Sequence, residues 1–230
     1  MGESYEDADR LQAVRRALSA LKVFPLHGVA VLPGTPTPLH VFEPRYRALV
    51  RDALRGDRVL AVPHLINAEG LRELHPPVLP VAGVGVIERH EQHRDGRYDI
   101  VLRGVARVRL AEELPSDAAY RVFRAELLED RWPAGGRAEI EPELESLRQL
   151  AYELATRLPP QSGAAELAEA VARLEDASAA ADLVAAAAVS EPQARQAVLE
   201  ELDVGRRLSR VISEVASVVL LLSRGRNVQA

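Results

Sequence analysis

The strongest constraint on the fold is a proline-rich stretch near the N-terminus, residues 23–50, which contains five of the fifteen prolines in the 230-residue chain. Proline fixes φ and has no amide hydrogen, so it interrupts strands rather than continuing them. We therefore expect a strand, a turn, a short second strand and then a helix. That helix should begin at Pro44, because the first helical position needs no amide donor.

The segment after Pro44 has apolar residues at helical spacing, and Gly56 stands where a C-terminal cap is expected. The chain then changes to short apolar segments separated by turn signals, of which Asp95-Gly96 is the strongest. Gly83 and Gly85 indicate a bend or a close backbone approach within a strand. The expected strands are 58–65, 81–89, 98–102, 104–110 and 120–128. With the two early strands, this pattern predicts a small barrel or sandwich of six or seven mostly antiparallel strands with one early helix.

The period of the apolar pattern becomes helical from about residue 139. We expect helices over 140–158, 167–174, 180–187, 192–202 and 204–222. Ser178, Ser190 and Asp203 are the candidate N-caps. Alanine runs in this part indicate helices that approach each other closely. The predicted organisation is an N-terminal arm or short helix (1–22), a β subdomain (23–130), a linker (131–138) and a helical subdomain (139–230).

Composition excludes several classes of function. Lys22 is the only lysine, and no phosphate-binding loop of the G-x-x-x-x-G-K-[ST] type surrounds it. There is no cysteine, which excludes disulfides, thiolate metal sites and a cysteine nucleophile. The net charge of −5 argues against a dominant phosphate-binding role. Residues 1–22 do not have the apolar core of a signal peptide, and no apolar run reaches the ~20 residues of a membrane span, so we expect a cytoplasmic protein.

Several strings, in order over residues 23–222, resemble the N-terminal domain of Lon protease. The opening strings are Phe24-Pro25-Leu26, Val31-Leu32-Pro33-Gly34 and Pro38-Leu39-His40-Val41-Phe42-Glu43-Pro44-Arg45-Tyr46. The strand landmarks are Gly83-Val84-Gly85, Asp95-Gly96-Arg97 and Gly104-Val105-Ala106-Arg107-Val108. The helical matches are Ala181-Asp182-Leu183-Val184 and Leu199-Glu200-Glu201-Leu202-Asp203-Val204-Gly205-Arg206-Arg207-Leu208. This resemblance implies an α+β fold, a PUA-like small β-barrel followed by a C-terminal helical bundle.

The resemblance also implies a module that recognises unfolded or partly folded polypeptide, such as an adaptor or quality-control factor, and that could work with a separate ATPase or protease. We expect no catalysis and no cofactor. Binding would use an apolar groove or sheet edge between barrel and bundle, by strand addition or apolar contact. The candidate contact residues are Pro36, Leu39, His40, Phe42 and Tyr46, for which a role in core packing is equally compatible with the pattern.

Glu43 and Arg45 are expected to form a structural brace at the start of the helix, where a carboxylate meets the positive end of the helix dipole. An alternative function is RNA binding through Arg103, Arg107 and Arg109, although the stretch has few aromatic residues for base stacking. We favour a solvated sheet face there. A cryptic hydrolase would need a nucleophile, and no motif supplies one.

The sequence His90-Glu91-Gln92-His93 is the best local pattern for a metal site, but it precedes a turn and no third ligand is evident. We therefore expect a solvated turn and no metal.

Overall fold

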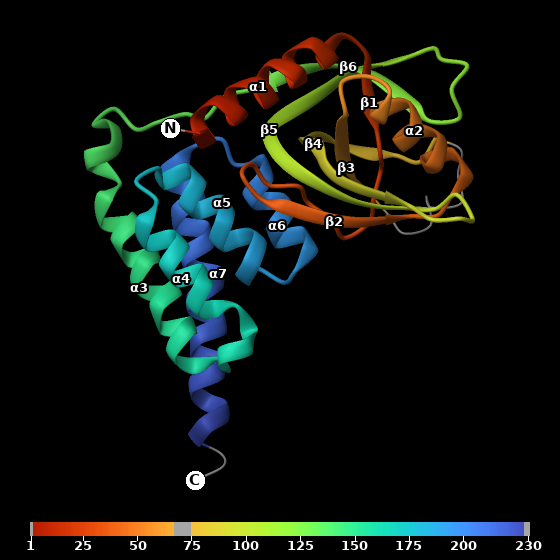
Figure 1. Ribbon diagram of the computed structural model, residues 1–230. Coiled ribbons are helices and arrows are strands. Elements are labelled where there is room, and N and C mark those ends of the chain that lie inside the picture. Colours follow the sequence, from red (N-terminus) through yellow and green to blue (C-terminus); the bar gives the residue numbers. More distant parts are fainter. Residues whose placement is uncertain (1, 67–74, 228–230) are drawn as a thin grey trace. The chain divides into compact units, whose positions relative to one another are not determined.

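The computed structural model describes the backbone of residues 2–66 and 75–227 and the side chains of residues 6–66 and 75–223. Residues 67–74, which follow the first of the expected strands after the early helix, 58–65, therefore lie outside the described residues. The chain divides into two compact units, Met1–Glu129 and Asp130–Ala230. We call them the barrel unit and the helical unit, and each is described by itself (Figure 1).

The barrel unit is built on one six-stranded sheet. Its strands are β1 (Leu21–Val23), β2 (Pro36–Val41), β3 (Val59–Leu65), β4 (Val78–Gln92), β5 (Tyr98–Leu114) and β6 (Arg121–Leu128). The pairings run β5–β4–β3–β1–β6, and β6 pairs again with β5, so five strands form a ring. β2 adds to the first half of β5, and all pairs except β1–β3 are antiparallel. The predicted α+β class and small barrel are confirmed.

Among its described residues, the barrel unit has two apolar clusters, one beside helix α1 (Gly2–Ala17) and one beside helix α2 (Pro44–Leu54). β3 is buried on both faces because Leu60 and Val62 belong to the α2 cluster, whereas Val59 and Ala61 belong to the α1 cluster. α1 packs on β3, β4 and β5. Of the two alternatives expected for residues 1–22, an arm or a short helix, the structure therefore shows a packed helix. A short 3-10 turn, η1 (Leu18–Ala20), connects it to β1.

One expectation about the strands was wrong. The segments 98–102 and 104–110 were expected to be separate strands, but both belong to β5, which continues through Gly104. A Cβ atom at Gly104 would lie 2.1 Å from the carbonyl oxygen of Leu32, and one at Gly83 would lie 1.9 Å from that of Val31. These glycines therefore allow the segment before β2 to approach the sheet, and they do not mark strand ends.

The described part of the helical unit, residues 130–227, contains five α-helices, among which α3, α5 and α7 contact one another (Figure 1). They are α3 (Glu141–Arg157), α4 (Ala164–Arg173), α5 (Ala177–Ala188), α6 (Pro192–Glu200) and α7 (Val204–Asn227). Short 3-10 turns, η3 (Gly136–Glu139) and η4 (Pro160–Ser162), flank α3. No helix among the described residues has the length and apolar character of a membrane span.

The helix caps only partly follow the prediction. The carboxylate of Asp203 accepts a hydrogen bond from the Arg206 amide at 2.9 Å, as expected for the cap of α7. α5 is capped by Asp176, whose carboxylate accepts from the amide of Ser178, so Ser178 itself is not the cap. The N-cap residue of α6 is Glu191, one residue later than the expected Ser190.

The start of the helical unit is tied to the start of α7. The Arg131 amide donates to the Leu202 carbonyl at 2.8 Å, and the Val204 amide donates to the Arg131 carbonyl at 3.0 Å. The first residue of the predicted linker 131–138 is therefore held by the helical unit.

Candidate functional site

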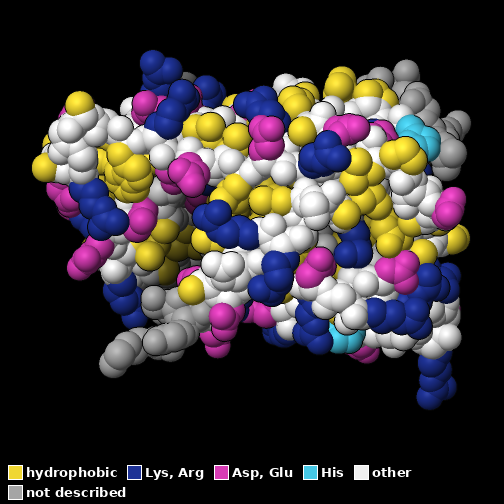
Figure 2. Space-filling model, turned by 90° about the horizontal axis from the view of Figure 1, so that it is seen from above, with side chains coloured by type: hydrophobic (Ala, Val, Ile, Leu, Met, Phe, Trp, Pro, Cys, Tyr) yellow, Lys and Arg dark blue, Asp and Glu magenta, His cyan; other side chains and the backbone are white. Residues whose placement is uncertain are grey.

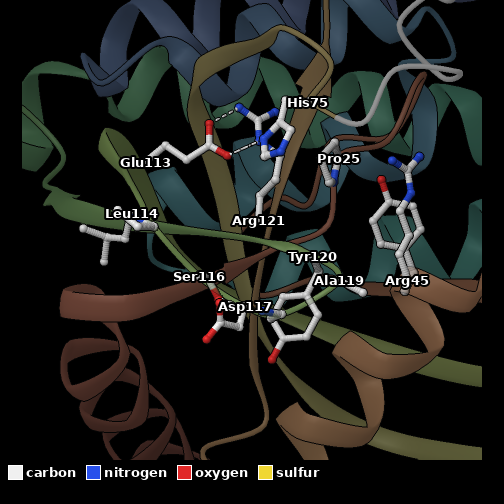
Figure 3. Close-up of a pocket in the computed structure, with 13 residues that line it drawn as sticks. Pro25, Arg45, His75, Glu113, Leu114, Ser116, Asp117, Ala119, Tyr120 and Arg121 are labelled. Atoms are coloured by element: carbon white, nitrogen blue, oxygen red, sulfur yellow. Dashed lines mark hydrogen bonds and ion pairs between the residues drawn. The ribbon is translucent and has the colours of Figure 1, made fainter.

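The barrel unit has a cavity of about 750 Å³ beside the start of α2 (Figure 3). Its walls come from Pro25, from Arg45 and Tyr46 on α2, from His75, and from residues 113–121 between β5 and β6. A volume of this size lies within the range of ligand pockets. The lining combines apolar side chains with a few charged ones, which suits a peptide-like ligand better than a purely apolar molecule.

A charged group forms one wall of this cavity, as the dashed contacts in Figure 3 show. Arg121 donates from Nε to Glu113 Oε1 at 2.9 Å and from Nη2 to Glu113 Oε2 at 2.8 Å. His75 Nδ1 lies 2.8 Å from the same Oε1. The hydrogen bonds from Arg121, reinforced by that from His75, lower the pKa of the Glu113 carboxyl. This wall is therefore largely neutralised internally.

The α2 side of the cavity consists of Arg45 and Tyr46. Arg45 Nε donates to Glu43 Oε2 at 3.0 Å, and the Arg45 guanidinium lies 4.5 Å from the centre of the Tyr46 ring. Tyr46 also packs on Phe24, with ring centres 4.6 Å apart. Burial raises the pKa of the Tyr46 hydroxyl. The Glu43 carboxylate thus contacts Arg45 and makes no side-chain cap bond to the helix.

Three described side chains of the cavity are of types that occur in hydrolytic sites. His75 and Glu113 form a base-and-carboxylate pair, and Ser116 also lines the cavity. The Ser116 hydroxyl accepts a hydrogen bond from the Ala118 amide at 3.1 Å, and Figure 3 shows it well away from His75. A nucleophile needs direct contact with its base, and these described residues do not make that contact.

Sequence reasoning missed the part of the cavity formed by residues 113–121. The only local signal was the polar composition of Pro115-Ser116-Asp117, which indicates a turn between strands and no more. The cavity exists because β5 and β6 pair antiparallel, which brings Glu113 next to Arg121 on the adjoining strand ends.

The five predicted contact residues do not share one surface. Pro36 and His40 are exposed on the outer face of β2, and Phe42, which follows the strand, is 60% exposed. Leu39 points toward the α2 cluster and is half-buried. Tyr46 is only 6% exposed and contributes to the wall of the cavity. We call Pro36, Pro38, His40 and Phe42, which are exposed at alternate positions, the β2 outer strip.

The free edge of β2 is poorly suited to strand addition. The Thr35 carbonyl accepts from the Gly104 amide on β5, so the alternate residues Pro36, Pro38 and His40 direct their backbone groups away from β5. Two of these three residues are prolines and offer no amide hydrogen to an incoming strand. The β2 outer strip would therefore bind through its side chains.

The proposed arginine face is not a continuous exposed surface. Arg107 is only 3% exposed, and Arg103 donates to Glu88 Oε2 at 3.2 Å and to the Gly34 carbonyl at 3.1 Å. Of the three, Arg109 alone is exposed. On the face seen in Figure 2, basic side chains are spread among acidic and apolar ones. The idea of an exposed Arg103–Arg107–Arg109 surface was wrong because one face of a strand can be covered at one position and exposed at another, as Arg107 and Arg109 are.

Comparison with known proteins identifies relatives that match most of the chain. The model of the substrate-binding domain of ATP-dependent protease La (Lon) matches residues 20–217. Lon protease 2 of Myxococcus xanthus is 30% identical over 195 residues, which cover 84% of this chain and 23% of that protein. Lon protease of Anaeromyxobacter dehalogenans is 29% identical, over 84% of this chain and 22% of that protein. The chain thus spans about a quarter of the length of these curated relatives.

Two solved structures share the fold. The N-terminal domain of Mycobacterium avium complex Lon protease superposes with a TM-score of 0.68 at 21% identity, covering 86% of this chain and 98% of that one. A Lon N-terminal domain protein from Xanthomonas campestris gives a TM-score of 0.57 at 23% identity, covering 84% of this chain and 97% of that one.

Proposed function

This chain belongs to the Lon substrate-binding domain family, and on that premise we propose that it binds unfolded or partly folded polypeptide without catalysing a reaction. The observation that carries the proposal is the family match over residues 20–217, which spans most of both units. The matching portions of the curated relatives belong to proteins named Lon protease. A role as an adaptor or quality-control factor, cooperation with a separate ATPase or protease, and a cytoplasmic location are parts of the same proposal.

The barrel unit offers two surfaces for a client chain. Phe42 on the β2 outer strip is an exposed aromatic side chain on an otherwise mixed surface, and unfolded segments are rich in apolar side chains that would pack on it. The cavity beside α2, of about 750 Å³, has room for one or two client side chains, and its lining includes Ala119. Client binding would therefore rest on apolar contact, with limited backbone pairing at the proline-rich edge of β2.

The absence of catalysis is supported by the chemistry of the residues. Lys22, the only lysine, has its amino group 3.4 Å from the Asp57 carboxylate on the surface of the barrel unit. A Ser–Lys dyad requires a lysine that contacts a serine, and Lys22 has a carboxylate in that place. The proposal therefore expects the purified chain to show neither ATP hydrolysis nor peptide-bond cleavage.

The binding proposal is tested by fluorescence anisotropy with a labelled, permanently unfolded protein and with the same protein in its folded form. We expect measurable affinity for the unfolded form only. Phe42→Ala and Ala119→Arg should each weaken this affinity by about fivefold or more, which corresponds to roughly 1 kcal/mol, the threshold for an important interface residue.

Two control variants match these changes. Tyr152→Ala is the control for Phe42→Ala, because it removes another exposed aromatic ring, one that is 67% exposed and lies on the helical unit. Ala111→Arg is the control for Ala119→Arg, because it adds the same charge at another exposed position. Both are expected to retain wild-type affinity. Equal affinity for folded and unfolded protein would contradict the function, whereas equal losses in test and control variants would contradict only the choice of surface.

A further inference from the structure

Three side chains with metal-binding chemistry meet on the outer face of the barrel unit, apart from the cavity. They are His40 on β2, His93 after β4 and Asp99 on β5. His40 Nδ1 lies 2.5 Å from Asp99 Oδ1, and His93 Nε2 lies 2.6 Å from Asp99 Oδ2. One ligand atom from each residue lies within 4.8 Å of the others. Two imidazoles therefore converge on one carboxylate from three separate chain segments.

The backbone fixes two of these ligands in place. His40 and Asp99 are directly opposite each other in the antiparallel β2–β5 pair, so their side chains lie on the same face. Two backbone hydrogen bonds close the turn that carries His93. The His93 amide donates to the Arg97 carbonyl at 2.9 Å, and the Gly96 amide donates to the His93 carbonyl at 2.9 Å. Gly96 has a φ of 83°, which glycine adopts without strain. The cluster is thus held by regular pairing and a tight turn.

The donor set defines the kind of ion that would fit. Imidazole nitrogen suits zinc, copper and nickel, and a set of two imidazoles and one carboxylate is typical of sites that leave a further coordination position open. The present N···O separations are hydrogen-bond distances. A metal at about 2.0–2.2 Å from each ligand atom would need these separations to widen by less than about 1 Å, which the exposed side chains of His40 and Asp99 allow.

From this geometry we infer that His40, His93 and Asp99 form a binding site for a divalent transition-metal ion such as zinc. The site differs from the local pattern 90–93, for which a solvated turn without metal was expected. Only His93 belongs to both sets. The other ligands are separated from it by 53 and 6 positions in the sequence, and His90 lies outside the cluster.

One neighbouring group opposes metal binding. Arg97 Nη1 lies 3.3 Å from Nε2 of His40, and the same guanidinium donates from Nε to Asp95 Oδ2 at 2.7 Å. Coordination through His40 Nδ1 would place the ring proton on Nε2, which could then no longer accept from Arg97. Arg97 must therefore turn away when the ion binds. Its exposed position and its separate contact with Asp95 permit this movement.

The proposal is tested by calorimetric titration of the full chain with zinc chloride, together with NMR of the imidazole resonances. We expect one zinc ion per chain and selective shifts of the His40 and His93 ring signals. His40→Ala, His93→Ala and Asp99→Asn should each weaken zinc binding by at least about tenfold, since even an outer-shell partner of a metal is worth roughly 10–100-fold in affinity.

His90→Ala is the matched control, because it removes an exposed histidine three positions from His93 without touching the cluster. This variant should bind zinc as the wild type does. Circular dichroism of every variant checks that the fold is intact. The absence of zinc binding, or a loss in His90→Ala equal to that in His40→Ala, would overturn the proposed site.

Discussion

Arg207 Nη1 lies 3.4 Å from Oδ2 of Asp182, and both side chains are almost completely buried inside the helical unit. The same guanidinium is ion-paired with Asp130 and donates from Nε to the Glu201 carbonyl at 3.0 Å. Ser178 links the group because its hydroxyl donates to Asp130 Oδ2 at 2.5 Å. This buried network joins α5 and α7 to the first residue of the unit.

Removing the cation from this network should strongly destabilise the helical unit. Arg207→Met leaves the Asp182 carboxylate buried beside an apolar side chain, and breaking a buried ion pair in this way costs about 3–5 kcal/mol. Urea denaturation followed by circular dichroism measures the loss. Arg173→Met is the control, because Arg173 and Glu169 are 75% and 74% exposed, and its cost should stay within about 1 kcal/mol. Equal costs would contradict the buried network.

Because residues 31–32 approach the sheet closely, even a methyl group added at Gly83 on β4 should destabilise the fold. Gly83→Ala places a Cβ atom 1.9 Å from the Val31 carbonyl oxygen, a backbone atom that moves only with its whole segment. We expect a loss of about 1–3 kcal/mol in unfolding free energy, as for other overpacked sites. At Gly56 the nearest atom is 3.7 Å away, so Gly56→Ala should cost less than about 1 kcal/mol. A Gly83→Ala protein as stable as the wild type would exclude the close approach.

Substitution of Tyr46 and of Phe42 should have very different effects on stability, although the two residues are only four positions apart. Tyr46→Ala removes a buried ring that packs on Phe24 and should cost about 3–5 kcal/mol. Phe42→Ala removes an exposed ring and should change the unfolding free energy by about 0.5 kcal/mol or less. Thermal or urea unfolding checks both. A large loss of stability in Phe42→Ala would assign Phe42 to the core.

The Glu113–Arg121 pair predicts a pH dependence of stability at acid pH. The hydrogen bonds from Arg121 lower the pKa of the Glu113 carboxyl in the folded state. The carboxylate of the folded chain therefore takes up a proton less readily than that of the unfolded chain. The contribution of the pair to the unfolding free energy is therefore present above the ordinary glutamate pKa of about 4.3. It is lost as the pH falls through the pKa that Glu113 has in the folded state.

Glu113→Gln should flatten this part of the stability curve between about pH 5 and pH 3. The effect should be about 1 kcal/mol or less, because the Glu113 side chain is 33% exposed and solvent screens the pair. Unfolding free energies of wild type and variant at several pH values provide the measurement. Parallel curves for the two proteins would show that the pair does not contribute.

The elements that depend on near neighbours in the sequence could be predicted. Pro44 and the apolar spacing after it located α2 and its buried residues. Asp95-Gly96 located the turn between β4 and β5, where Gly96 has the positive φ that such turns use. The cap of α5 was displaced by two residues because Asp176 and Ser178 are both good cap residues, and the final choice depends on where the packed helix begins.

The candidate sites were less predictable than the elements. Tyr46 and Phe42 both belong to the motif that indicated the family, but the motif does not show which ring is exposed. The cavity wall at Glu113 and Arg121 depends on how β5 and β6 pair, and no pattern of residue types in either strand sets that register uniquely.

By itself, the sequence determined most of the order of helices and strands, the resemblance to a Lon N-terminal domain, and the lack of a phosphate-binding loop in the chain. Only the tertiary structure decided that Arg107 is buried, that Arg207 lies inside an ionic network, and that His93 meets His40 and Asp99 instead of His90. The physical reason is range. Helices, turns and caps depend on residues within about four positions of one another, whereas burial and side-chain clusters depend on strands and helices that are brought together from distant parts of the chain.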